Sequence, residues 1–172
     1  MADIRIYGDP ILRRNAEKIT VFNDELRAFI NQMKEDMYES DGVGLAAPQV
    51  GRSICLSVVD ATAGEEEPYI LINPEIFYFS KEEEDYNEGC LSVPDITLPI
   101  RRSSVISVRA LDENGNEYTL EKVRGLLARA IQHETDHLNG ILFVDRASPV
   151  RRQLISGKLR KLAKSHRNKS QT

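Results

Sequence analysis

The sequence has 172 residues, of which 41% are hydrophobic and 29% are charged, a composition typical of a globular chain long enough to bury one core. Its formal net charge of −4 gives no overall indication of nucleic-acid binding, so we expect no DNA partner. The sequence contains no apolar run approaching the roughly 20 residues of a membrane helix and no secretion signal, so we expect a cytoplasmic protein without a membrane partner.

The first part of the chain predicts one amphipathic helix followed by a glycine-rich segment. Asn23 or Asp24 can cap the start of this helix, and Gly42 lies beyond its end. Between these points, apolar residues that we expect to face the core repeat at helical spacing: Leu26, Phe29, Ile30, Met33 and Met37. The next segment, 42–49 (GVGLAAPQ), is too rich in glycine to begin a helix and too apolar to form an exposed loop.

The middle of the chain predicts β-strands, and its last third predicts helices. Strand-like runs occupy residues 54–59, 69–72, 76–79, 105–111 and 117–120. Asn73-Pro74 separates the second run from the third, and Asn114-Gly115 marks a hairpin between the last two. One further helix is predicted from about 122 to 139, where Gly140 ends it, and another from about Pro149 onward.

This order of elements predicts an α+β fold. Antiparallel or mixed β-sheets would pack around a central helix that carries an HExxH motif, with further helices at the N- and C-terminal ends. We expect residues 1–172 to form a single catalytic domain, in which about 149–172 make a basic C-terminal helix and tail. The cysteines, Cys55 and Cys90, are not expected to form a disulfide, and Cys55 is expected to be a small buried apolar side chain.

The HExxH motif, His133-Glu134-Thr135-Asp136-His137, is the sharpest local signal in the sequence. Residues four apart lie above one another on a helix, so His133 and His137 can bind one metal ion from a single face. Glu134 projects beside them, where a carboxylate can act on a water molecule. Leu126 and Ala130 belong to the same face, so we expect the histidines to point inward.

The identity of the third metal ligand separates the classes of enzyme that carry this motif. No glutamate follows Glu134, and Phe143 stands where some zinc proteases have a third histidine, so two common downstream ligands are absent. The remaining candidates are Asp145, His166 and Cys90. Cys90 lies beside a glycine, and a thiolate is a good ligand for zinc and for ferrous iron. With two histidines it would leave a fourth position open, as a catalytic site needs.

Three motifs, in this order, resemble those of the peptide deformylase family: residues 42–49 (GVGLAAPQ), 88–92 (EGCLS) and 132–137 (QHETDH). The resemblance extends over nearly the whole chain, from residues 7–12 (YGDPIL) to the final helix, which is similar to that of the bacterial type I branch. It implies a metal-dependent hydrolase that removes the N-formyl group from the formylmethionine of newly synthesised proteins and releases formate.

The resemblance also implies the metal centre and its reactive groups. One divalent ion would be bound by Cys90, His133 and His137, with Fe²⁺ as the native ion and Zn²⁺, Ni²⁺ or Co²⁺ able to occupy the site. Glu134 would serve as general base and acid. The side chain of Gln49 and the backbone N–H of Leu91 would hold the formyl oxygen.

Substrate contacts follow from the same resemblance. Gly44 would hydrogen-bond the extended backbone of a formyl-methionyl nascent peptide, and the pocket for the methionine side chain would be lined by Val43, Leu126, Ala130 and His133. Arg129 stands where some members have an apolar residue, and we expect its stem to line the pocket while its head reaches water. The segment 95–98 (DITL), which includes Thr97, lacks a basic residue that some members use for substrate contact.

Charged residues outside the motifs carry two further expectations. Glu88 and Asp136 lie beside ligands and can orient them, with Arg102 as a partner for one of these carboxylates. After Asp145 the chain has no acidic side chain but many basic ones: Arg146, Arg151, Arg152, Lys158, Arg160, Lys161, Lys164, Arg167 and Lys169. Such a helix can dock on ribosomal RNA, although a merely solvated helix face has the same composition.

Two other functions remain open from the sequence alone. A zinc endopeptidase is disfavoured because its downstream ligand is absent, and cleavage of an unformylated internal peptide would support it. A non-catalytic metal-binding or ribosome-associated module is disfavoured because Glu134 and Gln49 are intact, although binding a metal requires neither of them.

Overall fold

The computed structural model describes the backbone of residues 3–169 and the side chains of residues 3–165. The helices are η1 (Pro10–Arg13) and η2 (Ala47–Val50), which are 3₁₀ helices, and α1 (Asp24–Glu39), α2 (Gly125–Leu138), α3 (Phe143–Arg146) and α4 (Pro149–Lys169). The strands are β1 (Gly44–Ala46), β2 (Leu56–Val59), β3 (Tyr69–Phe79), β4 (Glu83–Cys90), β5 (Val93–Ser103), β6 (Val105–Leu111) and β7 (Glu117–Arg124).

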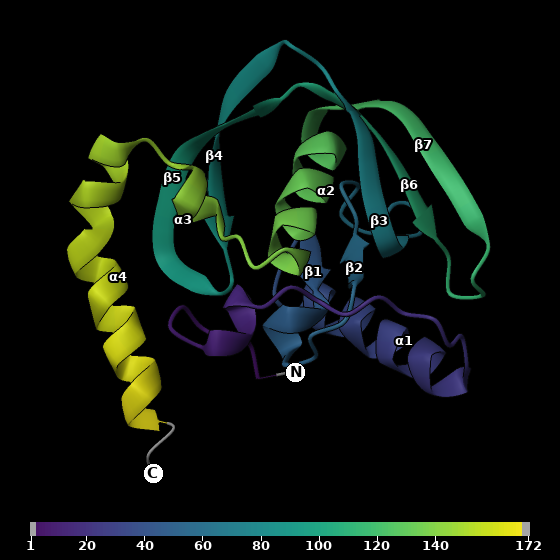
Figure 1. Ribbon diagram of the computed structural model, residues 1–172, viewed down its shortest axis with the longest axis horizontal. Coiled ribbons are helices and arrows are strands. Elements are labelled where there is room, and N and C mark those ends of the chain that lie inside the picture. The colour runs from purple at the N-terminus through teal and green to yellow at the C-terminus, as the bar shows by residue number, and fades with distance from the viewer. Residues whose placement is uncertain (1–2, 170–172) are drawn as a thin grey trace.

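These strands form two antiparallel sheets with α2 between them. One sheet has the order β1-β2-β3-β6-β7, and the other consists of β4 and β5. In Figure 1, α2 stands between the β4–β5 pair and the larger sheet, while α4 lies on the outer side of β4–β5 and α1 lies near β1 and β2. The α+β prediction, with the HExxH helix at the centre, is confirmed.

Helix α2 packs on the larger sheet, and a glycine two residues beyond its last residue terminates it. Ala128 and Ile131 are buried against Ile106 and Val108 of β6. At the end of the helix, Gly140 has φ of 69°, and a Cβ at this position would lie 2.6 Å from the carbonyl oxygen of Arg13. The left-handed conformation and this close approach together fix where the helix stops, as the sequence predicted.

Strands β4 and β5 were not expected from the sequence, although they carry one side of the site. β5 alternates buried and exposed positions, and Ile96, Leu98 and Ile100 face a core cluster that includes Ile155 and Leu159 of α4. β4 is mostly charged and exposed, so it lacks the apolar alternation that identifies a strand in sequence. Pairing with β5, rather than its own composition, therefore makes it a strand.

Two predicted boundaries are wrong for identifiable reasons. The strands expected at 69–72 and 76–79 are one strand, β3, because Asn73 is accommodated by a register shift and its side chain pairs with both backbone groups of Ile19. Helix α2 begins at Gly125 rather than near Lys122, because residues 122–124 continue β7 in its pairing with β6.

Other expectations agree with the structure. Asn23 caps α1, and its Oδ1 accepts a hydrogen bond from the N–H of Leu26 at 2.9 Å. The cysteines are free, and the expectation of a buried Cys55 holds in part, because the residue is half-buried with its Sγ 3.2 Å from the carbonyl oxygen of Ala16. Within residues 3–169, no helix combines the length and apolar character needed to span a lipid bilayer.

Candidate metal centre

A thiol from β4 meets two imidazoles from α2 at the centre of the molecule. Cys90 ends β4, and its Sγ lies 3.3 Å from Nε2 of His137. The possible ligand atoms of Cys90, His133 and His137 all lie within 4.8 Å of one another. The helix supplies two of these atoms from one face because His133 and His137 are four residues apart.

The other candidates for a third ligand do not join this cluster. Asp145 is held by a salt bridge with Arg13, and its Oδ2 accepts a hydrogen bond from the N–H of Leu142 at 2.9 Å. The side chain of His166 lies outside the described residues. Among the side chains that the structure describes, Cys90 therefore completes the set with the histidine pair.

The donors fit a divalent transition-metal ion. One sulfur and two imidazole nitrogens are typical ligands of zinc and iron. Burial lowers the pKa of His137 well below its ordinary value, so this ring is neutral and its nitrogen can bind a metal. Nδ1 of His137 is buried without a hydrogen-bond partner among the described residues, so the protein's own hydrogen bonds leave this ring incompletely satisfied.

Glu88 orients His133 from behind. Oε2 of Glu88 lies 3.0 Å from Nδ1 of His133, and the Arg102 guanidinium binds both carboxylate oxygens, at 2.6 and 3.0 Å. Although burial favours the neutral acid, the hydrogen bonds from His133 and Arg102 lower the pKa of Glu88 to about 2. An ionised carboxylate only accepts hydrogen bonds, so Nδ1 of His133 donates and its other nitrogen is directed at the cluster.

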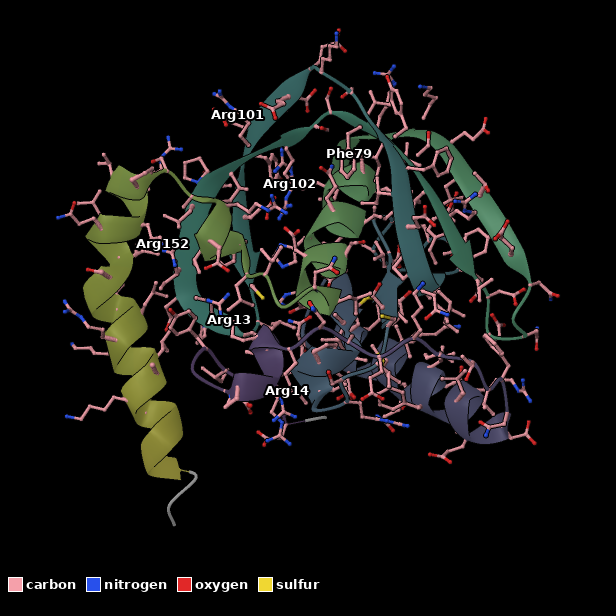
Figure 2. All side chains as sticks on the ribbon, viewed as in Figure 1. Arg13, Arg14, Phe79, Arg101, Arg102 and Arg152 are labelled. Atoms are coloured by element: carbon pink, nitrogen blue, oxygen red, sulfur yellow. The ribbon has the colours of Figure 1, made fainter. Side chains whose placement is uncertain are left out.

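Arg102 joins Glu88 to a second carboxylate on α2. Its Nη1 donates to Oδ2 of Asp136 at 2.8 Å, and Arg146 binds the same carboxylate at 3.1 and 2.6 Å. The sequence predicts that Arg102 pairs with Glu88 or Asp136. The structure confirms this pairing and shows that Arg102 binds both carboxylates. In Figure 2, Arg102 lies between β5 and α2, whereas Arg101, the next residue on the strand, points outward.

Glu134 lies beside the cluster with an unoccupied acceptor. The residue is only 4% exposed, and its Oε2 has no hydrogen-bond partner among the described residues. Burial raises the pKa of Glu134 to about 7, which suits a group that must both take and return a proton. A Cβ on Gly44 would lie 2.5 Å from Oε1 of Glu134, so only glycine at position 44 leaves room for this carboxylate.

Gln49 is held in a fixed orientation and lines the same pocket as Glu134. The N–H of Ala46 donates to its Oε1 at 2.9 Å, which leaves its Nε2 to face Ser92 Oγ at 3.2 Å and Cys90 Sγ at 3.5 Å. The amide N–H groups of Gln49 are therefore directed at the site. Ser92, which is fully buried, was not singled out from the sequence, although it belongs to the same EGCLS segment as Cys90.

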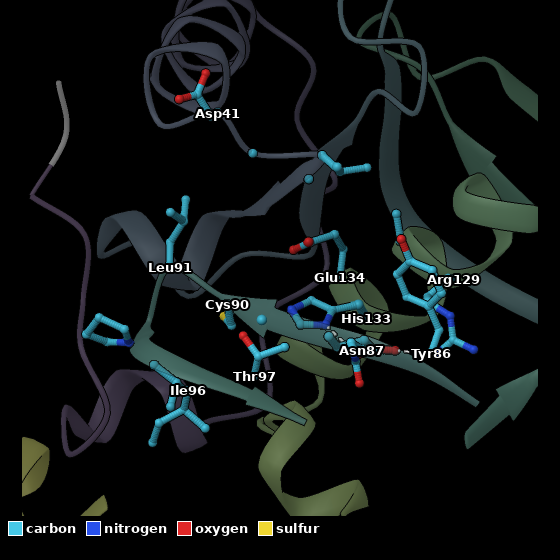
Figure 3. Close-up of a pocket in the computed structure, with 18 of the residues that line it drawn as sticks. Asp41, Tyr86, Asn87, Cys90, Leu91, Ile96, Thr97, Arg129, His133 and Glu134 are labelled. Carbon is cyan, nitrogen blue, oxygen red and sulfur yellow. Dashed lines mark hydrogen bonds and ion pairs between the residues drawn. The ribbon is translucent and has the colours of Figure 1, made fainter. Parts of the chain in front are cut away.

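A pocket of about 580 Å³ opens onto these groups. Figure 3 shows Cys90, His133 and Glu134 at its base and Leu91, Ile96 and Thr97 along one wall. The positions expected to contact substrate all line it, namely Val43, Gly44, Gln49, Leu91, Leu126 and Ala130. Leu126 is 43% exposed, so it lies at the rim of the pocket rather than in the buried core.

Arg129 lines the pocket as expected, but the expectation of a solvated head is wrong. The guanidinium is mostly buried and donates to Glu88 Oε1 at 2.7 Å and to two backbone carbonyl oxygens of the β4–β5 pair. Its guanidinium carbon also lies 5.4 Å from the centre of the Tyr86 ring. These partners come from strands that the sequence did not reveal, so no sequence pattern pointed to them.

Comparison with known proteins assigns the family. Residues 1–153 match the family model described as polypeptide deformylase. A peptide deformylase from Thermotoga sp. strain RQ2 is 47% identical over 165 residues, which cover 96% of this chain and 98% of that protein. Among solved structures, peptide deformylase 1B of Arabidopsis thaliana matches with a TM-score of 0.95 and 36% identity, covering 100% of this chain and 95% of that one.

A Plasmodium falciparum peptide deformylase matches with a TM-score of 0.91 and 38% identity, covering 96% of this chain and 98% of that one. The matches in sequence and in structure thus extend over nearly the full length of these relatives. The chain belongs to the polypeptide deformylase family.

Proposed function

We propose that this protein is a metal-dependent peptide deformylase, which hydrolyses the formyl amide at the N-terminal formylmethionine of nascent peptides. The observation that carries this proposal is the convergence of Cys90, His133 and His137 beside the buried carboxylate of Glu134, at the base of an open pocket. A structural metal site is closed by four protein ligands, whereas this set leaves a position for water and substrate.

Cys90, His133 and His137 would hold the metal ion. When bound, a divalent ion in such a site makes water more acidic and polarises a carbonyl group. We infer from membership of the family that Fe²⁺ is the native ion. A thiolate with two imidazoles also suits Zn²⁺, Ni²⁺ and Co²⁺, so these ions can replace it. The hydrogen bonds of Glu88 with Arg102 and His133 support a metal at this cluster, because they direct the other nitrogen of His133 toward it.

Glu134 is the proposed general base and acid. It takes a proton from the attacking water, whose oxygen forms a bond to the formyl carbon, and it returns that proton to the departing amine nitrogen as the C–N bond breaks. The products are formate and a peptide with a free methionine amino group. The raised pKa of Glu134 supports both halves of this role, since the group can change protonation state near neutral pH.

Two donors are proposed to stabilise the negative charge that grows on the formyl oxygen. They are the side-chain amide of Gln49 and the backbone N–H of Leu91, and one donor of this kind is typically worth about 2.7–4 kcal/mol. The hydrogen bond from the N–H of Ala46 supports the role of Gln49, because it leaves the amide donor of this side chain directed at the site.

The substrate backbone is proposed to extend along β1. This strand pairs with β2 on one side and is the edge of its sheet, so the outer edge of Gly44 can accept an added strand. Val43, Leu126, Ala130 and His133 would surround the methionine side chain, and all of them line the pocket. A carbonyl carbon that carries only hydrogen is the smallest acyl group, so the site can select formyl over acetyl ends by size.

We also infer that residues 1–172 act as one catalytic domain in the cytoplasm and that α4 docks on the ribosome. Ile155 and Leu159 attach α4 to the rest of the protein, while six basic side chains of the helix remain at least partly exposed: Arg151, Arg152, Lys158, Arg160, Lys161 and Lys164. Cosedimentation with ribosomes should fall when several of these lysines are changed to glutamate, and unchanged binding would reject this part of the proposal.

The activity is tested by formate release from formyl-Met-Ala-Ser, using protein purified without oxygen and loaded with nickel or iron. Acetyl-Met-Ala-Ser and an unformylated peptide serve as control substrates, and Glu134→Ala serves as the inactive variant. Formate release that the variant lacks supports the proposal. Cleavage of the internal peptide bond would indicate an endopeptidase, and a metal-loaded protein that acts on none of these substrates would indicate a non-catalytic module.

A further inference from the structure

One arginine ties the helix that carries the two histidines to the strand pair that carries the thiol. We propose that Arg129 is a positioning residue of the metal centre, which acts through Glu88 on His133 and through the β4–β5 backbone on Cys90. This inference rests on the proposed metal site and reaction. Arg129 lies four residues before His133, so both side chains leave α2 on the same face, one turn apart.

The first path from Arg129 runs through Glu88. A carboxylate can accept about four hydrogen bonds, and the structure supplies four donors to this one. Oε1 accepts from Arg102 Nε at 2.6 Å and from Arg129 Nη1 at 2.7 Å, while Oε2 accepts from Arg102 Nη2 and His133 Nδ1, both at 3.0 Å. Loss of Arg129 therefore leaves Oε1 with Arg102 Nε as its one remaining donor and weakens the hold on the carboxylate that orients His133.

The second path runs through the backbone of the strand pair. Nη1 of Arg129 donates to the carbonyl oxygen of Ile100 on β5 at 3.0 Å, and Nη2 donates to that of Glu84 on β4 at 2.7 Å. One planar group thus holds both strands against α2. Because Cys90 ends β4, this attachment sets the distance between the thiol and the two imidazoles.

The geometry requires the arginine fork rather than a positive charge alone. Nη1 binds Glu88 Oε1 and the carbonyl oxygen of Ile100, while Nη2 binds the carbonyl oxygen of Glu84. A lysine ammonium has one nitrogen and cannot reproduce contacts that two separate nitrogens make to these three acceptors. The side chain is 11% exposed and Tyr86 covers the guanidinium, so water does not readily replace the lost contacts. Figure 3 shows Arg129 and Tyr86 together at one side of the pocket, with His133 nearby.

The test compares Arg129→Gln and Arg129→Lys with Arg101→Gln. Arg101 is a matched control because it lies on the same strand pair and bonds Asp85 through a similar fork, but it is exposed and faces away from α2. Zinc affinity is measured by competition with a chromophoric chelator, and the visible spectrum of the cobalt-loaded protein reports the ligand geometry. Formate release from formyl-Met-Ala-Ser gives kcat and KM, and thermal unfolding gives Tm.

We expect both Arg129 variants to bind zinc at least about 10-fold more weakly than the wild type and to show an altered cobalt spectrum, while Arg101→Gln matches the wild type. Wild-type zinc affinity and cobalt spectrum in Arg129→Lys would overturn the proposal, even if its Tm fell, because the residue would then be merely structural. If the wild type binds metal but releases no formate, the proposed reaction fails, and the affinity data still decide the role of Arg129.

Discussion

Gly44→Ala is expected to inactivate the enzyme by displacing the catalytic carboxylate. A Cβ at this position would lie 2.5 Å from Oε1, 2.8 Å from Cγ and 2.9 Å from Cδ of Glu134. Ordinary contact begins at 3.4 Å, so Glu134 or strand β1 must move by about 0.9 Å. A misplacement of about 1 Å can cost about 100-fold in rate, and we therefore expect kcat for formyl-Met-Ala-Ser to fall by about that factor.

Gly42→Ala provides the matched control for this prediction. Its Cβ would meet the carbonyl oxygens of Met37 and Gly44 at 3.3 and 3.4 Å rather than the side chain of Glu134. We expect kcat within about threefold of the wild type for this control and equal zinc affinity in both variants, since neither change touches a ligand. A folded Gly44→Ala protein with wild-type kcat would refute the reasoning, because Glu134 would then tolerate a displacement that the geometry requires.

Three further perturbations test other parts of the account. Glu134→Gln should keep zinc affinity in chelator competition while formate release falls by at least about 100-fold, because a general base typically contributes 10²–10⁴-fold; equal turnover would remove its assigned role. Arg102→Met leaves the buried carboxylates of Glu88 and Asp136 without the guanidinium that they share. The free energy of unfolding, measured by urea titration, should fall by about 3–5 kcal/mol. A loss below about 1 kcal/mol would contradict this prediction. Although burial opposes ionisation, hydrogen bonds from Thr62, Tyr38 and Gly64 lower the pKa of Asp60 to about 2. The ionised carboxylate therefore stabilises the fold at pH values above about 3.9, the pKa of an unfolded Asp, and this stabilisation is lost as the pH falls toward 2. Asp60→Asn should flatten the pH dependence of stability in that range, and an unchanged slope would argue against it.

The sequence predicted the parts of the fold that repeat with a helical period or alternate in apolar character. Helix α1, the strands flanking Asn114-Gly115 and the helix of His133 each carry such a pattern, and each lies where it was expected apart from its boundaries. Strand β4 carries none, because its glutamates and Asp85 are paired with arginines from other elements or face solvent. Its strand character depends on tertiary contacts that a local pattern does not contain.

The same distinction applies to the site. The ligand candidates His133 and His137 follow from helical spacing, and Cys90 follows from its motif, so the sequence alone predicted a cluster that the fold brings together. The convergence of Arg102 and Arg129 on Glu88 depends on how far β4 and β5 lie from α2, which no sequence interval specifies. The sequence accordingly predicts a solvated head for Arg129, whereas the structure gives this head protein partners.

The central claim is that Cys90, His133 and His137 hold one divalent ion on which formate release depends. The most direct test titrates metal-free protein with nickel under anaerobic conditions and follows bound metal and formate release from formyl-Met-Ala-Ser together. We predict that the rate of formate release rises in proportion to bound nickel and saturates at about one ion per chain. The variants Cys90→Ala and His137→Ala should lose both high-affinity nickel binding and formate release. Full turnover without metal, or wild-type affinity in both variants, would contradict the account.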